Sequence, residues 1–233
     1  MLIRAKYARD YNLRYISHLE IMDTFRKGIR RAGLPGAYSQ GFNPTLNLSL
    51  SQPLPVGMAG GGEFLDIEIT KPITGEGFKA RLNSFLPEGL KILDSRYIPD
   101  QNGLKSLQAL LNRAEYHISP RGKLKENSKE LIIELMEEDK VIVVRKRRNK
   151  SDREYDIRPL IFDAKILGND KISFLVSTGS SGNVRPEEII KALQKLEPEI
   201  PDHSVIDFYR SGLFVEKGDK IISPLTDQVL EER

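Results

Sequence analysis

The sequence predicts an α+β protein made of two tandem ferredoxin-like units, each with a β-α-β-β-α-β order and an antiparallel sheet. Two observations support this prediction. Apolar residues alternate along several short segments, as in half-buried strands, and recur at helical spacing in others. The order of these segments in residues 1–100 is broadly repeated in the second half of the chain. A length of 233 residues suits one or two domains whose core needs no disulfide.

The first unit is expected at residues 1–100. Alternation predicts strands at 2–9, 46–50, 64–70 and 90–97. A helix should follow Ser17, which has capping-box spacing to Glu20, and should end at Gly33. Its core-facing stripe is expected to consist of Leu19, Met22, Phe25, Ile29 and Ala32. A second helix is expected at 74–86.

A linker with a short helix is expected at 101–113, and the second unit at 114–233. The predicted strands of this unit are 115–119, 140–147, 155–167, 171–178 and 204–216. Helices are expected at 125–138 and from Pro186 onward. The second unit therefore carries an extra hairpin strand, and the repeat is one of architecture rather than of sequence identity.

The composition excludes several classes of function. The chain has no cysteine, which removes disulfides, thiol nucleophiles, iron–sulfur clusters and Cys-based zinc sites. Its three histidines are not spaced as metal ligands, and neither a GxxxxGK[ST] loop nor a GxSxG elbow is present. We therefore expect no metal and no cofactor. The absence of a long apolar run and of a signal-peptide pattern predicts a cytoplasmic protein without a membrane partner.

Basic residues are unevenly distributed in a chain of net charge +3. Residues 1–62 hold eight basic residues against three acidic ones, and residues 145–153 hold six against one. Local positive fields of this kind attract polyanions such as nucleic acids. The alternative is that both segments are simply solvated surfaces.

A candidate nucleic-acid interface combines the basic end of the first helix with the loop that follows it. The loop YSQGFNP offers aromatic rings and side-chain amides, which suit stacking on unpaired bases and recognition of their edges. The helix end, the basic segment at 145–153 and two later arginines offer cations for phosphates. The expected contact residues are Arg26, Lys27, Arg30, Arg31, Tyr38, Gln40, Phe42, Asn43, Arg145, Arg147, Arg148, Arg158 and Arg185. The alternative for the loop is an ordinary turn with Phe42 packed into the core.

His18 is the candidate catalytic residue. It lies in the first turn of the predicted helix, where the positive end of the helix dipole disfavours the protonated ring. A neutral imidazole can act as a general base, but base catalysis needs a placed partner that the sequence does not identify. A first-turn residue selected for packing is the alternative.

The chain resembles, over essentially its whole length, the bacterial radical-SAM-linked family, also catalogued as a domain of unknown function. The resemblance is most specific in residues 15–69 and weaker in Asp156–Pro159 and Gly182–Pro186. The resemblance implies a partner, because family members are fused to radical S-adenosylmethionine enzymes or encoded beside them. It also implies a role in RNA metabolism, since a ribonuclease of the G/E type and ribosomal proteins are frequent neighbours. Without cysteine, this chain is at most the attached partner of such an enzyme. After GFNP the family commonly has His, Pro and a basic residue, whereas this chain has Thr45, Leu46 and Asn47, which weakens a catalytic interpretation of the loop.

The leading hypothesis is a non-catalytic RNA-binding adaptor that acts with a radical SAM enzyme on transfer or ribosomal RNA. One alternative is a metal-independent endoribonuclease with His18 as base, by fold-level analogy with CRISPR RNA-processing endonucleases. The other is a pure protein-interaction module that docks the radical SAM partner and binds no RNA.

Overall fold

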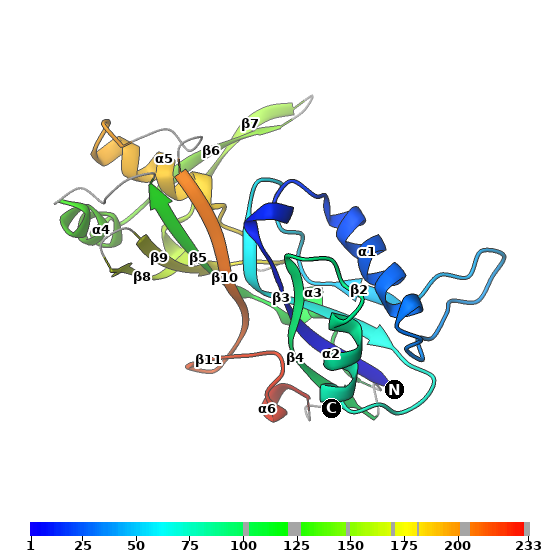
Figure 1. Ribbon diagram of the computed structural model, residues 1–233. Coiled ribbons are helices and arrows are strands. Elements are labelled where there is room, and N and C mark those ends of the chain that lie inside the picture. The colour runs from blue at the N-terminus through cyan, green and yellow to red at the C-terminus, as the bar shows by residue number, and fades with distance from the viewer. Residues whose placement is uncertain are drawn as a thin grey trace. The chain divides into compact units, whose positions relative to one another are not determined.

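The computed structural model of the chain describes residues 1–99, 103–120, 127–147, 150–168, 171–180, 182–200 and 206–230. These residues form two compact units, one of Met1–Asn112 with Arg210–Arg233 and one of Arg113–Tyr209. Helices are combined with mainly antiparallel strands (Figure 1), which confirms the predicted α+β class. The segment from Arg210 onward, which the sequence analysis assigned to the second unit, belongs to the first.

Four strands of the first unit form an antiparallel sheet in the order β4-β1-β3-β2. They are β1 (Leu2–Arg9), β2 (Leu48–Leu50), β3 (Ala59–Glu68) and β4 (Leu90–Ile98). Helix α1 (His18–Arg31) connects β1 to β2, and α2 (Gly75–Asn83) connects β3 to β4. Both the chain order and the strand order are those of a split β-α-β unit.

The core of the first unit lies between this sheet and its two helices. Alternate residues of β1, such as Ile3 and Ala5, share one apolar cluster with Phe25 of α1 and Phe78 of α2. The same cluster contains Leu65 of β3. Both helices therefore cover the same face of the sheet, as their apolar spacing predicts.

Helix α1 begins with the predicted capping box. The backbone N–H of Ser17 donates to the Glu20 carboxylate over 2.8 Å, and the N–H of Glu20 donates to the Ser17 hydroxyl over 3.3 Å. The predicted apolar stripe is wrong at one position, because Leu19 is 73% exposed. Ile21 is buried instead, so the first turn of α1 faces the sheet with Ile21 and not with Leu19.

Strand β3 begins at Ala59, whereas the sequence placed Gly60–Gly62 in a loop. Its neighbour β10 (Ile206–Lys217) explains the difference. A Cβ added to Gly62 would lie 2.5 Å from the carbonyl oxygen of Ser211 and 2.6 Å from the Cα of Gly212. Glycine is therefore required where the backbone of β3 approaches β10.

Shorter elements complete the first unit. They are η1 (Tyr11–Leu13), α3 (Leu107–Leu110) in the predicted linker, β11 (Lys220–Ile222), which pairs with β10, and α6 (Asp227–Leu230). Helix α2 ends at Asn83, three residues before the predicted end.

The second unit has an antiparallel sheet in the order β5-β9-β8, with two helices and a separate hairpin. Its strands are β5 (Arg113–Pro120), β6 (Ile142–Arg147), β7 (Lys150–Asp156), β8 (Ile161–Leu167) and β9 (Lys171–Ser177). Its helices are α4 (Ser128–Glu137) and α5 (Pro186–Leu196). The predicted strand at 155–167 is interrupted by η2 (Arg158–Leu160), and β6 pairs with β7 outside the main sheet. A tandem repeat of two ferredoxin-like units is not confirmed.

In the ranges that the structure describes, no helix has both the length and the apolar character needed to cross a membrane.

Candidate nucleic-acid interface

The exposed side of α1 carries four basic residues. Lys27 is neutralised by Asp23, with 2.7 Å between its Nζ and the carboxylate. Arg30 and Arg31 are exposed, and no acidic side chain forms an ion pair with either within the described part of the chain. The hydrogen bond from Lys27, with the nearby charges of Arg26 and Arg30, lowers the pKa of Asp23 below its usual value. This end of α1 therefore has a net positive field.

Arg26 is half-buried on the same helix. Its Nε is shielded from solvent and has no hydrogen-bond partner in the structure. A ligand at the surface cannot reach this shielded N–H, so Arg26 contributes to the site through the positive charge of its guanidinium.

A further guanidinium reaches this end of α1 from the other helix. Arg81 lies in the last turn of α2, and its Nη2 is 3.0 Å from the position that a Cβ of Gly33 would occupy. Gly33 terminates α1 with a left-handed φ of 56°. The sequence does not predict Arg81 at this site, because only the tertiary packing of α2 against α1 brings it here.

The loop Tyr38–Leu46 projects beyond the C-terminal end of α1 (Figure 1). Tyr38 and Leu46 form a β-bridge, and the N–H of Ser39 donates to the carbonyl of Thr45 over 2.8 Å. The N–H of Thr45 in turn donates to the Ser39 hydroxyl over 3.1 Å. The stem of the loop is therefore a hydrogen-bonded pair of segments, and Thr45, where the family commonly has histidine, is part of it.

The tip of this loop exposes the predicted base-contacting side chains. Phe42 is fully exposed, and Tyr38, Gln40 and Asn43 are also exposed. The alternative that Phe42 packs into the core is therefore wrong. Leu46 is the residue of the loop that is buried instead.

The stem of the loop packs against α1 through Gly36. A Cβ at Gly36 would lie 2.5 Å from Cδ2 of Leu46 and 3.6 Å from Cγ2 of Ile29 in α1. The loop is therefore anchored on the helix that carries the arginines. This packing brings together two groups of predicted residues in one unit, the cations of α1 and the aromatic and amide side chains of the loop.

The predicted arginines of the second unit have structural partners. Arg145 donates from Nε and Nη2 to the two carboxylate oxygens of Glu188, over 2.6 Å and 2.8 Å, and its guanidinium stacks on Tyr155. The bond to Glu188 raises the pKa of Arg145 above its ordinary value. Arg158 donates to the carbonyls of Met136 and Ile161, the latter over 3.0 Å.

For the other three predicted arginines of the second unit, the structure describes no comparable side-chain hydrogen bonds. Arg185 is exposed at the start of α5, with its backbone N–H bonded to Glu188 over 3.0 Å. Arg147 belongs to β6 by its backbone, whereas its side chain and the whole of Arg148 lie outside the described residues. The phosphate contacts of the second unit stay predictions, and Arg145 and Arg158 are available for them only by leaving their present partners.

His18 is half-buried at the start of α1. Burial lowers the pKa of its imidazole below the usual value of 6.5; Glu63 opposes this shift, and Arg210 and Arg9 reinforce it. The ring is therefore neutral at pH 7, for reasons that extend beyond the helix dipole. No hydrogen bond within the described residues involves the imidazole, so nothing there orients it as a base.

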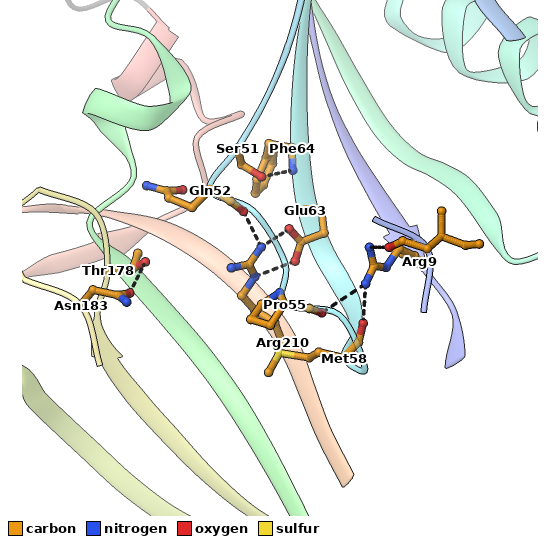
Figure 2. A network of polar contacts seen from close by, with 11 residues as sticks. Arg9, Ser51, Gln52, Pro55, Met58, Glu63, Phe64, Thr178, Asn183 and Arg210 are labelled. Carbon is orange, nitrogen blue, oxygen red and sulfur yellow. Dashed lines mark hydrogen bonds and ion pairs between the residues drawn. The ribbon is translucent and has the colours of Figure 1, made fainter. Parts of the chain in front are cut away.

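The two arginines near His18 are engaged in holding the fold (Figure 2). Arg9 donates to the carbonyls of Ile16 over 3.1 Å and Met58 over 2.8 Å, which joins the turn before α1 to the loop before β3. Arg210 donates from Nε to Glu63 over 2.8 Å, and both side chains are 2% exposed.

The described residues offer no other evident site of chemistry. No group of three His, Asp or Glu side chains among them is placed to hold a metal ion. A shallow cavity of about 590 Å³ lies beside β2 and is lined by Asp66, Glu68 and Lys105, among others. A second, of about 490 Å³, lies between Asp94 of β4 and the segment around Asp227. Neither cavity includes His18 or the loop Tyr38–Leu46.

Comparisons with solved structures show a distant likeness to three complexes. For a Cbf5-Nop10-Gar1 complex the identity is 12%, with 92% of this chain and 50% of that chain covered at a TM-score of 0.42. An archaeal box H/ACA sRNP Nop10-Cbf5 complex is 10% identical, with 90% of this chain and 48% of that chain covered at a TM-score of 0.39. A chain of an H/ACA RNP bound to a substrate RNA containing 2′-deoxyuridine is 12% identical, with 90% of this chain and 46% of that chain covered at a TM-score of 0.39. The chain thus spans about half the length of the chains it matches, and likeness at this level does not extend their function to this protein.

Comparison with protein families is more decisive, although no curated protein matches the sequence. A family model matches residues 2–186, most of the chain, and is described as an uncharacterized protein conserved in bacteria, DUF2344. The loop Tyr38–Leu46, the basic end of α1 and most of both units fall within this match. The protein therefore belongs to the DUF2344 family of bacterial proteins.

Proposed function

We propose that this protein is a non-catalytic RNA-binding adaptor that binds unpaired RNA through α1 and the loop Tyr38–Leu46. The observation that carries the proposal is the fully exposed ring of Phe42 on a hydrogen-bonded loop whose stem packs against the helix of Arg30 and Arg31. Stacking of a base on an exposed aromatic ring is worth about 1–3 kcal/mol and tolerates any base. Arginines next to such a ring supply the phosphate contacts that the stacked strand needs.

The side chains divide the work according to their chemistry. Phe42 and Tyr38 stack bases, while Gln40 and Asn43 offer amides to base edges. Phosphates are bound by the cations of α1, of which Arg30 and Arg31 have the greatest exposure without an acidic partner. Arg26 and Arg81 strengthen the same field, whereas the charge of Lys27 is balanced by Asp23.

The proposed protein partner is a radical SAM enzyme, and the proposed RNA is a transfer or ribosomal RNA. Both rest on the resemblance of residues 15–69 to the radical-SAM-linked family and on the RNA-related neighbourhood of that family. Within this proposal the chain contributes RNA binding, and the partner contributes the chemistry.

The test is a titration of purified protein with fluorescent bacterial small RNA across a salt series. We expect the double variant Arg30→Glu/Arg31→Glu to bind at least tenfold more weakly. The slope of log affinity against log salt should fall by about 1.4, since each phosphate contact to single-stranded RNA contributes about 0.7. The matched control is Lys191→Glu/Lys220→Glu, which makes the same charge change at exposed lysines elsewhere. Equal effects of the two double variants, or no RNA binding by the wild type at low salt, would refute the proposal.

A second candidate is the metal-independent endoribonuclease, which is favoured by one observation, the neutral imidazole of His18 near Arg9 and Arg210. The missing orienting partner for the ring counts against it. Incubation of labelled RNA with the wild type and with His18→Ala in EDTA decides the matter. Cleavage by the wild type alone would establish catalysis by His18, and intact RNA in both samples would exclude it.

The third possibility, a pure protein-interaction module, predicts a different pair of results. The radical SAM enzyme would co-purify with the chain after nuclease treatment, and the pure chain would have no affinity for RNA.

A further inference from the structure

We propose that the bound RNA strand continues along α1 to a second stacking site at the opposite end of the helix, formed by Tyr11, Arg14 and Tyr15. This inference rests on the RNA-binding function proposed above and extends its footprint. It predicts a preference for single-stranded RNA long enough to reach both ends of α1.

The second site is a cation held against two aromatic rings. The guanidinium carbon of Arg14 lies 4.6 Å from the ring centre of Tyr15 and 5.8 Å from that of Tyr11. Arg14 also donates from Nη1 to the carbonyl of Tyr11 over 2.8 Å. With 67% of its surface exposed, Tyr15 has room for a base beside the guanidinium. Aromatic rings and guanidinium planes are the surfaces on which proteins stack unpaired bases.

This arrangement is fixed by buried contacts before any ligand binds. The carbonyl of Arg14 accepts hydrogen bonds from the N–H of Gly57 over 2.7 Å and from Nη2 of Arg9 over 3.2 Å. Arg9 is almost fully buried, and Gly57 adopts a left-handed φ of 93° in the loop before β3. A preorganised site loses less conformational freedom on binding, which increases the affinity that its contacts provide.

A stripe of exposed and half-buried residues along α1 joins the two ends. At 100° per residue, Arg26 and Arg30 lie within about 20° of Leu19 around the helix axis. The rise of 1.5 Å per residue places Arg30 about 17 Å from Leu19. Asp23 is the acidic residue nearest this stripe, and Lys27 neutralises it. The part of the path that follows α1 from Leu19 to Arg30 therefore carries two arginines and is about five stacked nucleotides long at 3.4 Å each.

Leu19 follows the second site in sequence, and Val56 precedes Gly57, whose N–H bonds the Arg14 carbonyl. Both side chains are exposed and would equally suit a protein partner. The combination of two tyrosines with an interleaved arginine, at one end of a basic helix stripe, favours RNA over protein. A protein on this patch is the competing outcome of the experiment.

The experiment compares fluorescent oligouridylates of about 4 and about 12 nucleotides, since only the longer one reaches both sites. The variant Tyr15→Ala should bind the 12-mer about tenfold more weakly, the loss expected for one stacked base. It should bind the 4-mer within about twofold of the wild type, because the loop site remains. Tyr15→Phe keeps the ring and should restore 12-mer affinity. Circular dichroism checks that each variant is folded, which the exposure of Tyr15 leads us to expect.

The variant Phe42→Ala separates failure of this inference from failure of the proposed function. If Phe42→Ala weakens binding of both oligonucleotides while Tyr15→Ala leaves the 12-mer unaffected, the second site is refuted and the RNA-binding function stands. If the wild type binds neither oligonucleotide, both are refuted. If Tyr15→Ala leaves RNA binding intact and abolishes co-purification of the radical SAM enzyme, the patch is a protein-docking surface and the inference is overturned.

Discussion

The buried ion pair of Glu63 and Arg210 should be among the most expensive polar contacts to break. Arg210 donates to both carboxylate oxygens of Glu63 and, over 2.8 Å, to the carbonyl of Gln52 (Figure 2). Arg210→Met leaves a carboxylate that is 2% exposed without its cation. Removal of one member of a buried pair costs about 3–5 kcal/mol, because the remaining charge stays desolvated. We expect a loss in the free energy of unfolding of that size.

The double variant Glu63→Leu/Arg210→Met should lose much less than the sum of the two single variants, because it leaves no buried charge. Urea denaturation followed by circular dichroism measures all four members of this cycle. The control is Lys165→Met, which breaks an exposed pair with Asp163 of 3.7 Å and should change stability by less than about 1 kcal/mol. A cost below about 1 kcal/mol for Arg210→Met, or strict additivity in the double variant, would refute the reasoning.

Three further predictions concern stability. Gly62→Ala should destabilise the protein by about 1–3 kcal/mol in urea denaturation, since its new methyl group would overlap the backbone of Ser211; a neutral effect would contradict the close approach of β3 and β10. Ser17→Ala removes the N-cap of α1 and should cost about 1 kcal/mol, which Ser17→Asn should largely restore. His18 has a lowered pKa, so the unfolded chain takes up its proton first and stability should fall as pH drops through about 6.5. The midpoint of urea unfolding should therefore fall more for the wild type than for His18→Gln between about pH 7.5 and about pH 5.5, and parallel falls would contradict the buried, neutral ring.

Local sequence signals predicted the elements that depend on local physics. The capping box at Ser17 and the alternation of β1 were sufficient because caps and period-2 burial involve residues close in sequence. Leu19 was misplaced because the first turn of a helix has fewer neighbours that fix which side faces the sheet. Gly60–Gly62 resembled a loop because the reason for glycine there, the approach of β10, comes from the far end of the chain.

The candidate site was predicted where it is contiguous in sequence and missed where it is tertiary. Arg30 and Phe42 lie on adjacent segments, so composition alone placed them together. Arg81 joins them only through the packing of α2. Arg145 shows what the sequence leaves out: a basic hairpin strand predicts phosphate binding, and only the structure reveals that this side chain already bonds Glu188. Charge composition cannot distinguish a free cation from one engaged by a distant carboxylate.

The sequence of the second unit interrupts that of the first, which has a consequence during protein synthesis. The segment Arg113–Tyr209 is continuous, whereas the first unit needs Arg210, which follows Glu63 by 147 residues. A ribosome that adds about 5–20 residues per second takes roughly 7–30 s to cover that interval. During this interval, Glu63 of the nascent first unit has no Arg210 with which to form its buried ion pair. The segment Arg113–Tyr209 ends before Arg210, so the second unit is synthesised in full before the first. On the translating ribosome, the first unit can form its buried Glu63–Arg210 ion pair only after Arg210 has emerged.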